Sequence, residues 1–192
     1  MNSIVDRFVE KVTEIMVLDD VDIIKLRYAI SIIVNEVAKF LIIVILFSML
    51  GKLIPLLFTM MIILPVRITT GGLHFNSNIS CFAASLIFFL LSIVLLPQIA
   101  MERINYHMLF LICAALIGIL PLEPSIKRPI ISKNKYLFNK YLSFAFIIIS
   151  ILFILFILND QYLVRCGIWA FVLQAIQLLL LNIIKFTRRF IS

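Results

Sequence analysis

Long apolar runs separated by short polar segments make up most of the chain. Six runs are membrane-spanning candidates, and they cover residues 28–50, 53–66, 81–96, 106–120, 141–158 and 164–184. A segment that crosses hydrocarbon must satisfy its own backbone hydrogen bonds, which a single apolar run does as an α-helix. The pattern therefore predicts an all-α integral membrane protein with six transmembrane helices, which we expect to form a single domain over residues 1–192.

The first residues follow a different pattern. Between residues 3 and 18, apolar side chains such as Phe8 and Val12 recur every three or four positions, opposite charged side chains such as Arg7 and Lys11. This spacing predicts an amphipathic helix. An ordinary amphipathic helix folded back on a loop would show the same spacing, but beside a membrane domain we favour an interfacial helix that lies on the bilayer.

The second run is the shortest. Its fourteen residues, 53–66, precede Arg67 directly. At about 1.5 Å per residue they span roughly 20 Å, which is less than the roughly 30 Å of hydrocarbon. Either the bilayer thins at this point, or the residues that follow begin below the membrane surface. In the second case their irregular backbone would need a cavity lined by protein or water.

Composition and charge narrow the class of protein. The chain is 64% hydrophobic and 14% charged, with a formal net charge of +7. The basic residues lie between the apolar runs, where they set membrane orientation, so we expect no nucleic-acid partner. With both termini cytoplasmic, thirteen basic residues fall on the inner side and only Lys52, Arg103 and Arg165 on the outer side. The charge pattern therefore predicts cytoplasmic termini.

The stretch from Arg67 to Cys81 gathers the residues that are capable of chemistry. Gly71 and Gly72 interrupt the helical pattern, and His74 follows them. A cysteine near the start of the next helix meets free amide groups and the positive end of the helix dipole, which stabilise a thiolate. His74 could take the thiol proton and later give it to a leaving amine. The alternative is a buried structural cysteine beside an interfacial histidine.

The residues around this pair each have two interpretations. Arg67 could hold a substrate carboxylate or stabilise an oxyanion, or it could anchor the helix at the membrane surface. Gly71 and Gly72 could let a peptide approach the backbone, or they could merely end a helix. Glu36 could line the active cavity, or it could pair with Lys39 and satisfy both charges.

The cysteines do not indicate a metal site or a disulfide. Cys81, Cys113 and Cys166 make no spaced pair. A metal site would need more ligands than His74 and Cys81 supply. We therefore expect neither a metal nor another cofactor, and we interpret Cys113 and Cys166 as packing residues.

The pattern Arg67-x3-Gly71-Gly72-x-His74-x6-Cys81 resembles the signature of the AgrB family of bacterial membrane peptidases. The length, the six runs, the amphipathic start and the basic loop at residues 121–129 fit that family as well. The resemblance implies a membrane cysteine endopeptidase. Such an enzyme cleaves the C-terminal tail of a small AgrD-like precursor through an acyl-thioester and promotes the thiolactone of a quorum-sensing autoinducing peptide.

The resemblance also implies roles for particular residues. His74 and Cys81 become the catalytic dyad, with Arg67, Gly71 and Gly72 as supports. Lys127 and Arg128 fall in the basic loop, which contributes to processing in the family. The expected partners are the bilayer, a second copy of the chain in a homodimer, and an amphipathic precursor with an internal cysteine and an acidic tail. The expected location is the plasma membrane of a Gram-positive bacterium, with the active site facing the cytoplasm.

Two other classes of function remain open. A polytopic transporter or exporter of a small peptide or solute, without peptidase activity, could use polar residues of the last run to line a path, namely Gln174, Gln177 and Asn182. A non-enzymatic membrane scaffold is the second. The chain shows no inverted repeat, which argues against transport as the sole function.

Overall fold

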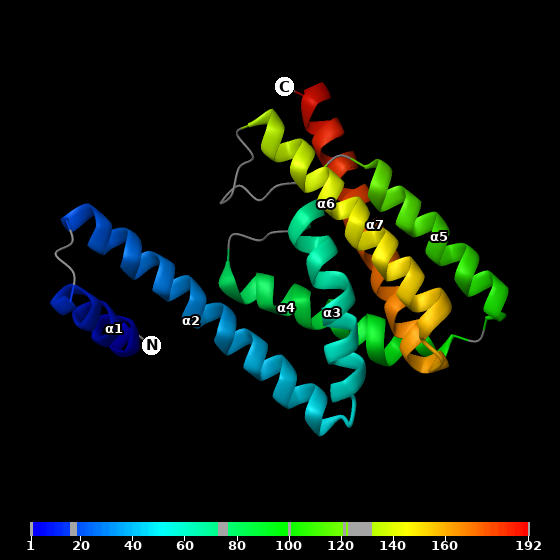
Figure 1. Cartoon of the computed structure of the whole chain (residues 1–192), viewed down its shortest axis with the longest axis horizontal. Coiled ribbons are helices and arrows are strands. Elements are labelled where there is room, and N and C mark those ends of the chain that lie inside the picture. Colours follow the sequence, from blue (N-terminus) through cyan, green and yellow to red (C-terminus); the bar gives the residue numbers. More distant parts are fainter. Residues whose placement is uncertain are drawn as a thin grey trace. The chain divides into compact units, whose positions relative to one another are not determined.

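The computed structural model describes residues 2–15, 19–72, 77–99, 101–120, 122 and 132–191. Within them every regular element is a helix, as predicted (Figure 1). The chain forms two compact units, Met1–Gly51 and Lys52–Ser192. The single domain over residues 1–192 stays a prediction.

The first unit contains two helices, α1 (Asn2–Ile15) and α2 (Asp20–Met49). An ion pair joins them, with Asp6 and Arg27 3.2 Å apart. α2 begins well before the predicted run 28–50. The reason is that charged residues are also good helix formers, so the apolar run marks only the part of the helix suited to lipid.

The second unit contains all the later elements. They are α3 (Leu53–Thr70), α4 (Asn78–Phe89), η1 (Leu90–Leu95), η2 (Leu96–Gln98), α5 (Arg103–Ile119), α6 (Lys133–Leu152), η3 (Phe153–Ile157) and α7 (Gln161–Ile191). Both η1 and η3 are π-helical turns that continue an α-helix, and η2 is a 3₁₀ turn.

Five helical stretches among the described residues are long and apolar enough to cross a membrane. They are Val21–Met49, Leu53–Thr70, Ile79–Gln98, Lys133–Ile157 and Gln161–Lys185. The apolar helix α5, with 17 residues, is shorter than these stretches. The chain is therefore a multi-pass membrane protein, and the sixth span stays a prediction.

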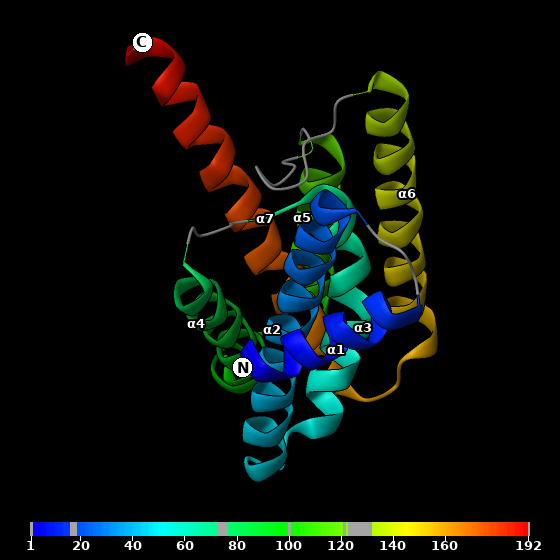
Figure 2. The same cartoon turned by 90° about the vertical axis from the view of Figure 1, so that its left-hand side faces the viewer.

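α3 and α7 pack together and run in the same direction (Figure 2). At their first turns Nζ of Lys52 lies 4.3 Å from the ring centroid of Tyr162. At the other end of α3, Nε2 of Gln174 lies 2.8 Å from the carbonyl oxygen of Gly71. The starts of α3 and α7 contact each other, and the end of α3 contacts a later part of α7, so the two helices are parallel.

α5 runs in this direction too. Tyr106 meets Trp169 with ring centroids 6.4 Å apart, and further along Phe110 meets Phe171 at 5.0 Å. Both ring pairs are edge-on, which is a favourable geometry for aromatic side chains. Phe110 and Phe171 are fully buried, so this contact is a central part of the core.

α6 runs in the opposite direction. Gly118 near the end of α5 lies against Phe144 in the middle of α6, and a Cβ built on Gly118 would lie 2.8 Å from that ring. The ammonium of Lys140 donates to the carbonyl oxygen of Leu120. Because α6 also packs against α3, the four helices α3, α6, α5 and α7 contact one another in a ring.

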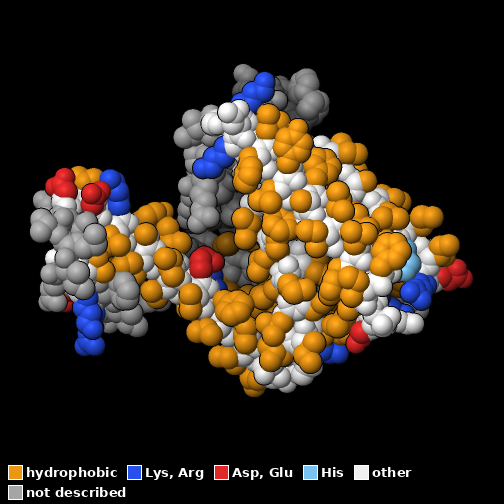
Figure 3. Space-filling view, in the orientation of Figure 1, with side chains coloured by type: hydrophobic (Ala, Val, Ile, Leu, Met, Phe, Trp, Pro, Cys, Tyr) orange, Lys and Arg blue, Asp and Glu red, His pale blue; other side chains and the backbone are white. Residues whose placement is uncertain are grey.

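The outer faces of these helices are apolar. Ile68, Ile119 and Phe156 are each more than three-quarters exposed. Figure 3 shows hydrophobic side chains over most of the face formed by α5 and α6, with charged side chains gathered towards the helix ends. Such a surface would aggregate in water and is suited to lipid.

α3 is longer than the predicted run 53–66. It continues through Arg67 to Thr70 and contains 18 residues, which at about 1.5 Å per residue span roughly 27 Å. Pro65 lies inside the helix without ending it. Neither a thinner bilayer nor a motif that begins below the membrane surface is therefore needed to explain the length of the second span.

Candidate active site

The predicted site begins where α3 ends. Gly71 has φ 87° and ψ −167°, and its amide donates to the carbonyl oxygen of Arg67 at 2.9 Å. A positive φ of this size is strained for a residue with a Cβ, so glycine is favoured at this position. The two glycines thus interrupt the helix where the sequence predicts.

Gly72 packs too closely against other residues to carry a side chain freely. A Cβ built on Gly72 would lie 3.2 Å from Nε of Arg67 and 3.6 Å from Oε1 of Gln177. The first distance is tighter than an ordinary van der Waals contact, so a larger residue would displace the arginine. Gly72 therefore allows Arg67 to lie against the backbone.

Arg67 reaches from the last turn of α3 towards α4. Its guanidinium carbon lies 5.2 Å from the ring centroid of Phe88, which is within the range of a cation–π contact. Phe88 belongs to α4, the helix whose first turn contains Cys81. The cation–π contact thus joins the helix end that carries Arg67 to the helix that carries Cys81.

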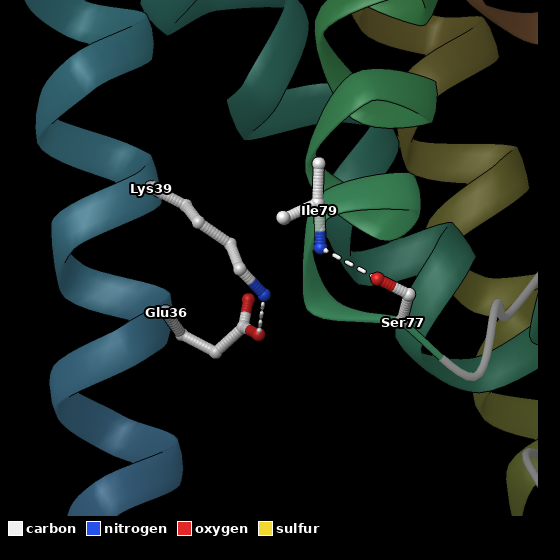
Figure 4. A network of polar contacts seen from close by, with 4 residues as sticks. All are labelled: Glu36, Lys39, Ser77 and Ile79. Carbon is white, nitrogen blue, oxygen red and sulfur yellow. Dashed lines mark hydrogen bonds and ion pairs between the residues drawn. The ribbon is translucent and has the colours of Figure 1, made fainter.

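Cys81 completes the first turn of α4, which begins at Asn78 rather than at the predicted residue 81. The Oγ of Ser77 accepts from the amide of Ile79 at 3.3 Å, as Figure 4 shows, and the amide of Cys81 donates to the Ser77 carbonyl oxygen at 3.1 Å. Side chains on a helix lean towards its N-terminus. The half-buried free thiol of Cys81 therefore belongs to the first turn, where amide groups and the helix dipole favour negative charge.

α7 fixes the turn after α3. Gln174 is fully buried, and its Nε2 donates to the carbonyl oxygen of Gly71 at 2.8 Å and to Oγ1 of Thr70 at 3.4 Å. The hydroxyl of Thr70 donates in turn to the carbonyl oxygen of Val66 at 2.8 Å. A buried carbonyl without a donor is costly, so this side chain stabilises the end of α3.

The far end of the segment that carries Cys81 is also attached to α7. α4 continues into the π turn η1, and the hydroxyl of Tyr162 donates to the carbonyl oxygen of Ile93 there. π turns misalign backbone groups and often carry carbonyl oxygens that other groups can bond. α7 therefore holds both the glycine turn before α4 and the turn that follows it.

Comparison with known proteins decides the family. The model of the accessory gene regulator B (AgrB) family matches residues 1–178. The chain belongs to the AgrB family. An AgrB-like protein of Clostridium beijerinckii is 26% identical over 162 residues, which cover 84% of this chain and 79% of that protein. No solved structure matches the chain.

Membership of the AgrB family confirms the resemblance drawn from the motif, and the predicted residues stand as follows. His74, Lys127 and Arg128 lie outside the described residues. Glu36 belongs to the other compact unit, where its carboxylate lies 2.7 Å from Nζ of Lys39 (Figure 4). This ion pair corresponds to the interpretation in which Glu36 and Lys39 satisfy each other's charges.

The other two cysteines of this AgrB chain are buried. Cys113 is 7% exposed and Cys166 is fully buried, which confirms their interpretation as packing residues. Within the described ranges no group of three His, Cys, Asp or Glu residues could hold a metal ion.

The role of Gln174 at the end of α3 is not predicted by the sequence, in which Gln174, Gln177 and Asn182 are interpreted as residues that could line a path. A polar residue inside an apolar span is costly without a partner, and this was the available signal. The partner itself, 103 positions away, could not be read from the sequence.

Proposed function

We propose that this chain is a membrane cysteine endopeptidase that cleaves the C-terminal tail of a small AgrD-like precursor and promotes thiolactone formation in a quorum-sensing autoinducing peptide. The observation that carries the proposal is the contact of the Arg67 guanidinium with Phe88 of α4, the helix whose first turn contains Cys81. Membership of the AgrB family, over residues 1–178, supports it.

The proposed reaction begins with proton transfer from the Cys81 thiol to His74. The thiolate attacks the carbonyl carbon of the scissile peptide bond, and the Arg67 guanidinium stabilises the oxyanion that forms. His74 then gives its proton to the nitrogen of the tail, which leaves as an amine. The precursor remains attached to Cys81 as an acyl-thioester.

Ring closure follows by thioester exchange. The internal cysteine of the precursor loses its proton and attacks the acyl carbon as a thiolate. The bond between the acyl carbon and the sulfur of Cys81 breaks, and Cys81 recovers a proton. This exchange leaves the number of thioesters unchanged, whereas hydrolysis is strongly downhill. Cyclisation must therefore be favoured over hydrolysis by the position of the internal cysteine and by the exclusion of water. A nucleophile among membrane-embedded helices favours both conditions.

The proposed topology has six spans, with α5 as the fourth, and α1 lying in the bilayer interface. Both termini and the active site face the cytoplasm, in the plasma membrane of a Gram-positive bacterium. The helix directions support this arrangement: α3, α5 and α7 run one way and α6 the other. The three basic residues expected outside, Lys52, Arg103 and Arg165, lie at or near the starts of α3, α5 and α7.

The proposed substrate is an amphipathic peptide with an internal cysteine and an acidic tail. An acidic tail is complementary to the basic residues Lys127 and Arg128 of the cytoplasmic loop. The apolar face of the peptide would lie on the bilayer and present its tail at the height of the site. A homodimer is part of the proposal, by analogy with the family.

The polar residues of α7 favour the peptidase over a transporter. Gln174 bonds to Gly71, and Nδ2 of Asn182 donates to the carbonyl oxygen of Leu178 in its own helix at 2.9 Å. Two of the three amides that could line a path are therefore used within the structure.

The deciding experiment replaces the nucleophile. Purified Cys81→Ser in proteoliposomes, given a synthetic precursor, should insert as the wild type does and leave the tail uncleaved. Cys113→Ala and Cys166→Ala should retain cleavage, because both thiols are buried packing groups. Mass spectrometry of the peptide measures the product, and cleavage by the serine variant at the wild-type rate would contradict the proposal.

A further inference from the structure

The second unit has a cavity at the end remote from Arg67. Its volume is about 210 Å³, and it lies among the starts of α5 and α7 and the end of η3. Its polar lining consists of Arg103, His107, Asn159, Gln161 and Arg165. The parallel course of α3 and α7 places this end by Lys52 and Tyr162, whereas the candidate active site lies at the other end of α3.

His107 presents an unused hydrogen-bond donor. Its Nε2 lies 3.3 Å from Nε of Arg103, which can only donate. The Nε2 atom is therefore the acceptor, and the neutral imidazole carries its proton on Nδ1. That Nδ1 atom is buried and has no hydrogen-bond partner among the described residues. Buried polar groups normally have partners, and this one belongs to a residue that lines the cavity.

The two arginines lack acidic partners. In the described part of the chain no carboxylate lies within ion-pair distance of Arg103 or Arg165. The nearby Asp160 instead caps α7, where it accepts from the amides of Tyr162 at 2.8 Å and Leu163 at 3.1 Å. The cavity therefore combines two positive charges with no carboxylate among the described residues that line it.

Arg165 is held in place at the cavity wall. Its guanidinium carbon lies 5.4 Å from the ring centroid of Tyr106, and its Nη1 donates to the carbonyl oxygen of Pro97 at 3.4 Å. A guanidinium has five N–H groups in a fixed plane, so these contacts leave donors free. A group held in advance by other contacts loses little freedom when it binds an anion.

We propose that this cavity binds a phosphate group, with the guanidiniums of Arg103 and Arg165 as donors. Arginine matches phosphate oxygens with paired N–H groups. A tetrahedral anion also has enough acceptors for donors that come from two side chains on two helices. The site lies at the ends of membrane-crossing helices, where lipid headgroups carry the same phosphate chemistry.

Trp169 provides a local probe. It is the single tryptophan of the chain, and its ring meets Tyr106, which lines the cavity. In detergent, inorganic phosphate should change its fluorescence saturably, with chloride at equal ionic strength as the control. In nanodiscs, native mass spectrometry should show retention of an anionic phospholipid over a zwitterionic one. Phosphate binding in detergent would identify the free anion as a ligand, and binding in nanodiscs alone would identify the headgroup.

Matched variants separate this site from general charge attraction. Arg103→Gln and Arg165→Gln should each weaken binding roughly tenfold or more, because charge-assisted hydrogen bonds are lost. Lys52→Gln removes one positive charge from the same end, but Lys52 does not line the cavity, so binding should change little. No saturable binding of either probe by the wild type, or an equal loss in Lys52→Gln, would overturn the proposal. Neither measurement depends on peptidase activity.

Discussion

At the scale of a single residue, Arg67 connects two helices. It belongs to the last turn of α3, and its guanidinium lies over Phe88 of α4, the helix that carries Cys81. A planar guanidinium can stack on a ring and still direct N–H groups to an oxyanion. A lysine ammonium at this position is a point charge on a flexible chain and cannot do both.

The first prediction follows from this difference. Arg67→Lys keeps the charge but should slow tail removal roughly tenfold or more, because the stacked, directed donors are lost. The acylation rate in a single-turnover assay measures the effect. Arg27→Lys is the matched control, because Arg27 pairs with Asp6 in the first unit, and it should cleave at the wild-type rate. Equal rates for both variants would remove Arg67 from the proposed mechanism.

At the scale of elements, α7 supports the site from the side. Gln174 connects it to the turn after α3, and Tyr162 connects it to η1. The two contacts attach the glycine turn and the segment that carries Cys81 to the same helix. A change in the middle of α7 should therefore reach the chemistry without touching the nucleophile.

The second prediction tests this connection. Gln174→Leu has nearly the same volume but leaves the Gly71 carbonyl without its donor, which costs about 1–3 kcal/mol. We expect cleavage to slow roughly tenfold, with the affinity for the precursor unchanged. Asn182→Leu is the control on the same helix, because the hydrogen bond that the Asn182 amide makes among the described residues lies within α7. A change in affinity alone, with normal acylation, would contradict a positioning role.

Hydrophobic periodicity predicts the elements but not their ends. α2 and α3 extend beyond the apolar runs 28–50 and 53–66, since a helix ends where capping and backbone conformation end it and not where the sequence becomes polar. α4 likewise begins at the Ser77 cap, before the predicted residue 81. Local chemistry therefore explains the limits that the pattern missed.

The candidate site likewise has features that the sequence predicts and features that it does not. The turn at Gly71 and Gly72 and the position of Cys81 near a helix start follow from short-range sequence. The contacts of Arg67 with Phe88 and of Gln174 with Gly71 depend on how helices pack. A single sequence carries no direct signal for such distant pairs, so these contacts required the structure.

At the scale of the whole molecule, helix direction and charge agree. α3, α5 and α7 run from the end that holds Lys52 towards the end that holds the Gly71 turn, and α6 returns. Within the described residues of the second unit, Arg67, Lys133, Lys135, Lys140 and Lys185 belong to the second of these ends, whereas Lys52, Arg103 and Arg165 belong to the first. A strong excess of Lys and Arg marks the cytoplasmic face.

The third prediction concerns this orientation. In a chain freed of its native cysteines, a cysteine at Ser132 should stay unlabelled by a membrane-impermeant thiol reagent in intact cells. A cysteine at Glu102, which is exposed at the start of α5, should be labelled. Permeabilised cells should label both, which checks that the sites are reactive. Labelling of Ser132→Cys in intact cells would reverse the topology.

The three thiols of the chain differ in what an inhibitor would meet. Cys113 and Cys166 are buried among helices, whereas Cys81 is half-buried in the first turn of α4, the helix that the Arg67 guanidinium contacts through Phe88. An electrophile that carries its own carboxylate should be drawn to Cys81, whereas burial blocks its access to the other two thiols. Iodoacetate should therefore favour Cys81 more strongly than iodoacetamide does. A reactive group paired with an anionic group is the starting point for a compound selective for Cys81.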